Sequence, residues 1–431
     1  MICGVAKKKI TPPVHLLENL HGLSNITFSE VLDDIFVRVL MLSDGQKKIL
    51  FVVFDLDKAP WPEKYLPALS AQTGIPEENI ALLSIHTHTA PITGWRPTEG
   101  PNFIERKPEH IQKATREYEE FLEKIVQDAV AEAMQAQQPV RIGWGIGESY
   151  INVNRVEEYV VRKEDGTTEV CIGLGQNPAA DVDRGLFVFR VEDLQGNLVA
   201  CLANYAVHNC VIIGNRCAKD GGTLLSGDLC GTVTQLIEEN HPGCVAFWTS
   251  GAAGDVNPIM MNQFFYPDPK TGAQAVHEVP IGDTTPLIML KVLSARHYAD
   301  ILRVLEQIVC EDEESTVDGA VKWLELPSSG EEPYRIRVHM SRIGELGIWG
   351  MSGELYSALG KAITQTLPSG THLIMNHDAS LITNSGYIFD DETFLRSENS
   401  MMPGRHNNEM LPGYVKEALL EATAEMWAKT V

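Results

Sequence analysis

IALLSIHTHTAP, at residues 80–91, joins a short apolar run to two histidines that stand two positions apart. The apolar run predicts a strand, and alternate residues of a strand share one side of it. His86 and His88 would therefore leave the end of the strand on the same face, so that one short element offers two imidazoles to a metal ion. An HxH pair also occurs as satisfied polar residues near a strand end, so its meaning depends on the rest of the chain.

Strand and helix patterns alternate over the whole length of the chain. The expected strands cover residues 35–42, 48–54, 138–145, 185–191, 198–207, 244–249 and 346–351. The expected helices cover residues 107–136, 231–240, 287–309, 356–366 and 413–428. This alternation predicts an α/β fold with a layered, mixed β-sheet core flanked by helices, in a single domain over residues 1–431. Two segments rich in proline, glycine and polar residues, 94–107 and 260–286, are expected to be long loops.

Composition limits the class of protein. With 431 residues, 44% of them hydrophobic and 22% charged, the chain can bury a large core and has the composition of a soluble globular enzyme. Lys and Arg number 35 against 58 Asp and Glu, a formal charge of −23, which argues against nucleic acid or an anionic membrane as a partner. The expected partner is a small-molecule or lipid-like substrate, and the sequence leaves the oligomeric state open.

The start of the chain and its cysteines predict a cytoplasmic location. MICGVAKKK, residues 1–9, lacks the long apolar core of a secretory signal, and no run of 18 apolar residues predicts a transmembrane span. The eight cysteines are scattered without a CxxC pair, which favours free thiols in a reducing compartment.

Polar residues follow several of the predicted strands. Five further short segments with polar residues, called islands below, lie at residues 152–155, 204–208, 226–228, 249–258 and 349–354. Within them His208, Asp255 and Glu354, like His86, lie just beyond the carboxyl ends of predicted strands, the edge where open α/β sheets place ligand sites. Two neutral imidazoles and a carboxylate suit a catalytic zinc ion and leave one position for water.

Each island also has a simpler explanation. His208 alone fits a buried, hydrogen-bonded histidine, and Ser226 with Asp228 fits the capping of a helix. The glycines of 251–254 fit a tight turn or a cradle of backbone amides for an anion. Glu354 could simply favour a helix N-terminus electrostatically. The residues alone therefore leave a metal site and a set of structural roles both open.

Taken in order, the motifs resemble the neutral, non-lysosomal ceramidase family, in particular its N-terminal catalytic domain. The resemblance rests on CGVAKKKITP at 3–12, HTHTAP at 86–91, NR at 154–155, AVH at 206–208, SGDLCG at 226–231, GDVNP at 254–258, GE at 353–354 and GYI at 386–388. These are similar to that family's opening strand with its DITGP-type turn, and to its HTHSGP, NR, AVH, SGDxxG, GDVSP, PGE and GYV motifs. The similarity spans roughly residues 3–400. The chain resembles a divergent, bacterial-type member of the family with a single domain.

The resemblance implies a ceramidase-like fold and one zinc ion per chain. By motif, the zinc ligands would fall on His86, His208, Glu354 and Tyr387. The family's second histidine would be His88, with a catalytic role, and its substrate-orienting arginine would be Arg155. Without the resemblance, Tyr387 would be interpreted as a turn residue packed beside Gly386.

The chain departs from the family at several points. Asn257 stands where the family has a serine often assigned as the nucleophile, and an asparagine amide can hydrogen-bond a substrate but cannot form an acyl-enzyme. SENS at residues 397–400 replaces a YEG-like tyrosine segment. The family's signal peptide and C-terminal immunoglobulin-like module also have no counterpart in the sequence. We therefore expect a substrate other than membrane ceramide.

These features together predict a zinc-dependent hydrolase that cleaves an amide-type (N-acyl) bond with metal-activated water. His88 would move a proton or stabilise the oxyanion, and Arg155 or Asn257 would hold the polar group of the substrate. Asp255 would orient a ligand histidine from behind. Cleavage of a C–O bond on the same scaffold stays open.

Two other functions also remain open from the sequence. A binuclear metallohydrolase of phosphoesters or lactones would use His86, His88, His208, Asp228 and Asp255. Against it, the usual HxHxDH run is broken, because residues 89–91 offer no ligand. A non-catalytic binding protein on the same fold would explain Asn257.

Overall fold

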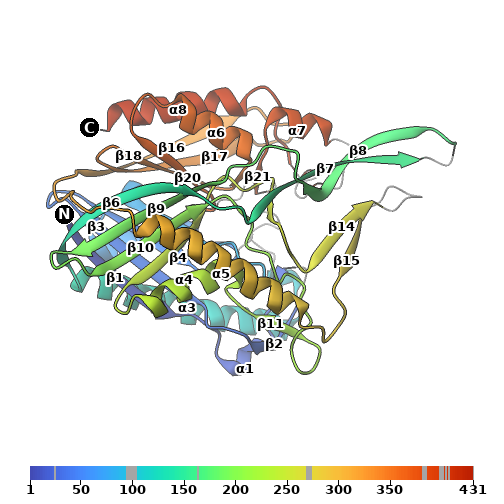
Figure 1. Ribbon diagram of the computed structural model, residues 1–431, viewed down its shortest axis with the longest axis horizontal. Helices are drawn as coiled ribbons and strands as arrows, with labels where there is room; N and C mark the ends of the chain where they lie inside the picture. Colours follow the sequence, from blue (N-terminus) through green and yellow to red (C-terminus); the bar gives the residue numbers. More distant parts are fainter. Residues whose placement is uncertain are drawn as a thin grey trace.

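The computed structural model of the chain consists of two β-sheets packed between two sets of helices (Figure 1). The structure describes residues 1–23, 26–93, 104–162, 165–267, 274–380, 386–397, 402, 405 and 408–430. In this part of the chain, no helix combines the length and the apolar character needed to cross a bilayer. All eight cysteines are free thiols, as their spacing predicted.

The larger sheet has the strand order β12-β10-β9-β6-β1-β3-β4-β5. Its strands are β1 Ile2–Lys9, β3 Phe36–Ser43, β4 Lys48–Phe54, β5 Ile80–Ser84, β6 Gln138–Glu148, β9 Gly185–Asp193, β10 Leu198–Tyr205 and β12 Val245–Ser250. β4 runs parallel to β5 and β10 runs parallel to β12, whereas the other neighbours are antiparallel. The helices that contact this sheet are α2 Pro62–Thr73, α3 Glu109–Gln135, α4 Asp228–Asn240 and α5 Thr285–Leu305.

The spacing of apolar residues along the chain explains how the helices pack against the larger sheet. In β3 the residues Val37 and Val39 share a buried cluster with Tyr118 and Leu122 of α3, whereas Leu40 belongs to the cluster on the other face of the sheet. The strand alternates between two buried faces because it is covered on both sides. In α3 the buried side chains recur every three or four residues, which gives the helix one apolar stripe against the sheet.

The smaller sheet packs on the face of the larger sheet that is opposite α3. Its strands are β16 Val317–Leu326, β17 Tyr334–Ile343, β18 Leu346–Met351 and β20 Thr371–Met375, in the order β16-β17-β18-β20, with β18 and β20 parallel. Helices α6 Ser357–Thr366 and α8 Val415–Lys429 cover its outer side (Figure 1). On its inner side Ile348 and Leu373 share a core cluster with Leu40 and Leu42 of the larger sheet. Apolar burial therefore joins the two sheets directly.

The remaining elements lie outside the two sheets and the helices that cover them. They are α1 Val14–Leu17, β2 Phe28–Val31, η2 Glu77–Asn79, η3 Ile104–Arg106, β7 Asn152–Arg162, β8 Thr168–Asn177, β11 Thr223–Leu225, β13 Val256–Pro258, β14 Gln263–Pro267, β15 Gln274–Glu278, β19 Glu354–Leu355, β21 Tyr387–Ile388 and α7 Asp391–Arg396. β13 pairs with β7, and β19 pairs in parallel with β21. The hairpins β7–β8 and β14–β15 extend away from the body of the molecule (Figure 1).

The structure confirms the predicted fold class, a layered mixed sheet core flanked by helices. The predicted strands at 48–54 and 346–351 have the observed bounds. The prediction of a loop over 260–286 is wrong at Gln263–Pro267 and Gln274–Glu278, which pair as the hairpin β14–β15. Of the other predicted loop, 94–107, residues 94–103 lie outside the described residues.

Candidate metal centre

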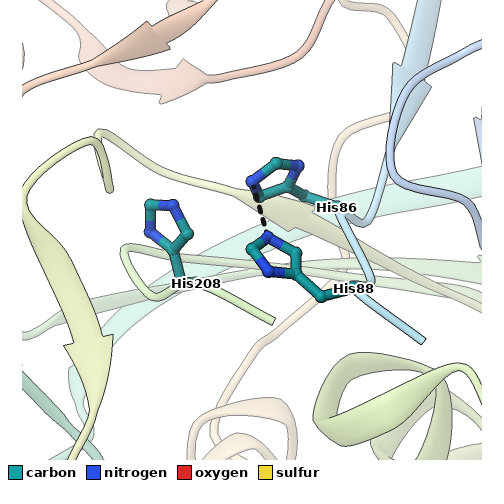
Figure 2. A group of neighbouring side chains, drawn as sticks. All are labelled: His86, His88 and His208. Carbon is teal, nitrogen blue, oxygen red and sulfur yellow. Dashed lines mark hydrogen bonds between the residues drawn. The ribbon is translucent and has the colours of Figure 1, made fainter. Parts of the chain in front are cut away.

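The candidate site lies where three pairs of parallel strands end. His86 follows β5, His208 follows β10, and Glu354 follows β18, each within three residues of the strand end. Figure 2 shows the rings of His86, His88 and His208 pointing toward one another. The three pairs belong to two sheets, and β12 contacts β4, β5 and β20, which brings these strand ends together.

His86 owes its position to a left-handed turn. β5 ends at Ser84 and His86 has φ of 58°, so the prediction that His86 and His88 alternate on one strand face is wrong. The turn nevertheless brings the two rings together, with 3.1 Å between their Nε2 atoms. Nδ1 of His86 lies 3.0 Å from Oδ1 of Asp57 and 3.1 Å from the Asp57 carbonyl oxygen. Asp57 therefore sets the orientation of the His86 ring.

His208 and Glu354 approach from the other side. Nδ1 of His208 lies 2.9 Å from the carbonyl oxygen of Val256, and its Nε2 lies 3.1 Å from Oε2 of Glu354. The same oxygen is 3.5 Å from Nε2 of His86. Glu354 is also paired with Tyr387 in the register of β19 and β21. All four predicted zinc ligands are therefore neighbours.

The hydrogen-bond partners of the two histidines test whether a cation fits. Asp57 and the Val256 carbonyl can only accept at Nδ1, so Nδ1 carries the proton of the neutral imidazole and Nε2 presents a lone pair. Both lone pairs face a carboxylate oxygen of Glu354. Three acceptors directed at one point repel one another unless a cation lies between them. The donor set of His86, His208 and Glu354 fits a zinc ion.

Two overlapping groups of ligand atoms occur among the described residues. The first is His86, His88 and His208, and the second is His86, Glu354 and His377; within each group the atoms lie within 4.8 Å of one another. His88 differs from the other two histidines of the first group, because its Nδ1 is buried and has no hydrogen-bond partner in the part of the chain described. Metal-ligating histidines almost always have such a partner, so His88 is the poorest ligand of the three.

Arg155, Asn257 and Tyr387 form one side of the site. Nη2 of Arg155 donates to the Gly254 carbonyl at 2.6 Å, and Nη1 lies 3.4 Å from Oδ1 of Asn257. The guanidinium carbon is 5.4 Å from the centre of the Tyr387 ring. The phenol of Tyr387 hydrogen-bonds with both Arg155 and Glu354, rather than packing as a turn residue. Arg155 belongs to β7 and Asn257 to β13, two strands that pair with each other.

Two acidic residues considered from the sequence have other roles. Asp255 does not orient a ligand histidine, which corrects that prediction: its carboxylate accepts from Ser357 at 2.6 Å and from Asn154 at 3.0 Å. The Asp228 carboxylate accepts from the backbone amides of Ile212 and Leu229. Neither carboxylate is directed at the histidines, which removes two of the five ligands of the binuclear alternative.

Sequence reasoning missed three residues of the site. Asp57 and Lys58 follow β4, whose end was predicted, so the strand-edge argument could have included them. His377 follows β20, which the sequence did not predict, and its ring stacks on that of His86 with 4.0 Å between centroids. Nζ of Lys58 lies 2.8 Å from Oε1 of Glu354 and 3.2 Å from Nδ1 of His377.

Burial and neighbouring charges shift the pKa values of the site residues in different directions. Burial lowers the pKa of His208 to about 4, with Arg155 adding to the effect, and burial with the nearby His86 lowers that of His88. Burial also lowers the pKa of His86, but the Glu354 and Asp57 carboxylates together outweigh it and the net shift is upward. Burial raises the pKa of Glu354, but Lys58 and His86 outweigh it and the net shift is strongly downward. The metal-free site therefore holds a proton on His86 more tightly than a free imidazole would.

The lowered pKa of His208 predicts a pH dependence of the metal-free protein. Between the unfolded value near 6.5 and the folded value of about 4, only the unfolded state binds the proton, so stability falls as pH falls through this window. From pH 7 to pH 5 we expect His208 to account for a loss of about 2 kcal/mol in unfolding free energy. His86 acts in the opposite direction, so the comparison must be made with a variant.

Urea unfolding of chelator-treated wild type and His208→Asn at the two pH values measures this contribution. The asparagine amide can still donate to the Val256 carbonyl but does not titrate. The loss of stability on acidification should be about 2 kcal/mol smaller in the variant. Equal losses in the two proteins would show that His208 does not titrate as described.

Two solved structures share this fold. The crystal structure of neutral ceramidase from Pseudomonas aeruginosa aligns with a TM-score of 0.69 and 15% identity, covering 99% of this chain and 73% of that chain. A ceramidase solved in complex with C2 aligns with a TM-score of 0.70 and 15% identity, covering 99% and 74%. No protein-family model matches the sequence, and no curated protein matches it. The chain therefore has the fold of neutral ceramidases, as its motifs predicted.

Proposed function

We propose that this protein is a zinc-dependent hydrolase that cleaves an amide-type (N-acyl) bond and holds one zinc ion per chain. One observation carries the proposal: Nε2 of His208 and Nε2 of His86 lie 3.1 Å and 3.5 Å from the same carboxylate oxygen, Oε2 of Glu354. Both solved structures described above are of ceramidases, which supports an amide as the bond that is cleaved.

His86, His208 and Glu354 would hold the ion, and Tyr387 would complete the set. Bound zinc lowers the pKa of a water molecule toward neutrality and so supplies hydroxide without a protein nucleophile. This chemistry is compatible with Asn257 in the place of a serine. Burial raises the pKa of Tyr387, so its phenol is neutral in the metal-free site.

His88 is the group that we assign to proton transfer. Its lowered pKa keeps the imidazole neutral at pH 7, so that it can accept a proton. Its Nε2 lies 3.1 Å from Nε2 of His86, at the edge of the proposed metal position. No described partner fixes the tautomer at Nδ1, which leaves the ring free to take up and release a proton.

Arg155 and Asn257 would bind the polar part of the substrate. Arg155 is buried and is held in place by the Gly254 carbonyl, so its remaining N–H groups form a fixed donor set. Such preorganised donors stabilise the negative oxygen that develops when an amide carbonyl is attacked. Asn257 adds a neutral amide beside them. The substrate that we propose is an N-acyl compound other than membrane ceramide.

Metal analysis combined with an activity screen tests this function. Wild-type protein should contain one zinc ion per chain and should hydrolyse at least one member of a panel of N-acyl amides that differ in acyl and amine groups. His86→Ala should bind zinc more weakly and lose about 100-fold in kcat/KM, equivalent to about 3 kcal/mol of transition-state stabilisation. The panel should also contain ceramide, esters, lactones and phosphoesters.

A matched control is available at the surface. The side chain of His15 is 66% exposed and pairs with Glu117, and neither residue contacts the site residues named above. His15→Ala should keep its zinc and its activity. Equal activity in wild type and His86→Ala would contradict the metal assignment, and bound zinc without turnover of any compound would favour a binding protein.

A further inference from the structure

Lys58 is a partly buried cation for which the proposed hydrolysis has no use. It lies in the turn after β4, and its side chain is 10% exposed. Its ammonium contacts Oε1 of Glu354 at 2.8 Å and Nδ1 of His377 at 3.2 Å. A lysine is seldom buried without a reason that outweighs the cost of removing its charge from water.

The contacts of Lys58 resemble the inner ligand sphere of a metal ion. An ammonium group can only donate hydrogen bonds, so Nδ1 of His377 must accept and presents its lone pair to Nζ. The carboxylate oxygen of Glu354 does the same. An imidazole nitrogen and a carboxylate oxygen directed at one point are the donors that a divalent cation takes.

The position of Nζ lies beside the proposed zinc position. Glu354 connects the two, because its Oε2 faces His86 and His208 while its Oε1 faces Lys58. His86, Glu354 and His377 offer ligand atoms within 4.8 Å of one another. A carboxylate between two neighbouring cation positions is the arrangement of two-metal hydrolases.

We propose that the Lys58 ammonium occupies the position of a second metal ion and thereby keeps the centre mononuclear. The inference rests on the proposed function, since it requires a first zinc ion on His86, His208 and Glu354. The ammonium leaves Glu354 a single oxygen for that zinc ion. It also supplies, within the chain, a positive charge that a two-metal enzyme takes from solution.

Zinc stoichiometry of Lys58→Met tests this proposal. Methionine has a similar length but no charge, so the lone pairs of Glu354 and His377 lose their cation. Native mass spectrometry of protein saturated with Zn²⁺ should give one ion per chain for wild type and two for Lys58→Met. Lys58→Arg keeps a positive charge and should give one. The double variant Lys58→Met/His377→Ala lacks a ligand of the second position and should also give one.

The outcomes separate this inference from the proposed function. A Lys58→Met protein that holds a single ion, with wild type also at one, would overturn the role of Lys58 and leave the hydrolase intact. Wild type without zinc would contradict both. If Lys58→Met does not fold, wild type in excess zinc still decides: binding of a second ion with Lys58 in place would overturn the proposal, and saturation at one ion supports it.

Discussion

Glu354→Gln should lose the bound zinc ion and about 1000-fold in kcat/KM, the largest effect that we expect from a single substitution. Glu354 is the only carboxylate among the described residues whose oxygen faces both His86 and His208. Loss of about 4 kcal/mol of transition-state stabilisation corresponds to this factor. Elemental analysis and steady-state kinetics on the N-acyl panel measure the two quantities.

The same substitution should also lower the unfolding free energy. The ammonium of Lys58 stays buried when its counter-charge is removed, and breaking a buried ion pair in this way costs about 3–5 kcal/mol. Lys58→Met/Glu354→Gln should recover much of this stability in urea unfolding but should still bind no zinc. Glu425→Gln, on the surface of α8, should keep both metal and activity. Stoichiometric zinc in Glu354→Gln would contradict the ligand assignment.

Asp378→Ala should lower the unfolding free energy by about 3–5 kcal/mol, because its buried carboxylate is paired and fully hydrogen-bonded. Oδ1 accepts from the backbone amide of Leu82 at 3.0 Å, and Oδ2 lies 2.5 Å from Nδ1 of His339 and 3.5 Å from Nη1 of Arg337. Leu82 belongs to the larger sheet and the other two residues to the smaller one. The alanine variant would leave the His339 ring and the Leu82 amide without their acceptor, and Arg337 without its counter-charge.

Urea unfolding at pH 7 measures this effect, and Asp181→Ala is the control. Asp181 pairs with Lys361 at the surface, where such a pair contributes about 0–1 kcal/mol. Burial raises the pKa of Asp378, but His339 and Arg337 outweigh it and the net shift is downward. The contribution is therefore complete above the unfolded pKa near 3.9 and is lost as pH falls through the folded value. A loss in Asp378→Ala no larger than that in Asp181→Ala would contradict this account.

Residues that follow long apolar strands were predictable from the sequence. The runs at 48–54, 198–207 and 346–351 predict strands with nearly the observed ends, so the positions of His208 and Glu354 at the sheet edge could be inferred. The pattern is strong because these strands are buried on both faces and consist almost entirely of apolar residues.

Other parts of the site could not be inferred from local pattern. β20 has only three apolar residues in succession, Leu373–Met375, and because this strand was not predicted the position of His377 was missed. A left-handed backbone at a histidine has no sequence signature, which is why the turn at His86 was not foreseen. Tyr387 entered only through family resemblance, because its strand has two residues.

Side-chain direction was the weakest part of the prediction. Asp255 lies one residue from Val256, whose carbonyl does orient His208, yet the Asp255 carboxylate is directed at Ser357. Adjacency in sequence places a residue near a site but not its functional group in it. The partner that orients His86 is instead Asp57, 29 positions away.

The candidate ligands belong to both sheets, since His86 follows β5 of the larger sheet and Glu354 follows β18 of the smaller one. A cation that binds only when the sheets are docked stabilises that arrangement by mass action, by about 4 kcal/mol at a concentration 1000 times its dissociation constant. Conversely, firmer docking of the two sheets raises the affinity for the cation. Zinc affinity then measures how firmly the two layers are held together, and a cavity made between Leu42 and Ile348 would weaken metal binding without touching a ligand.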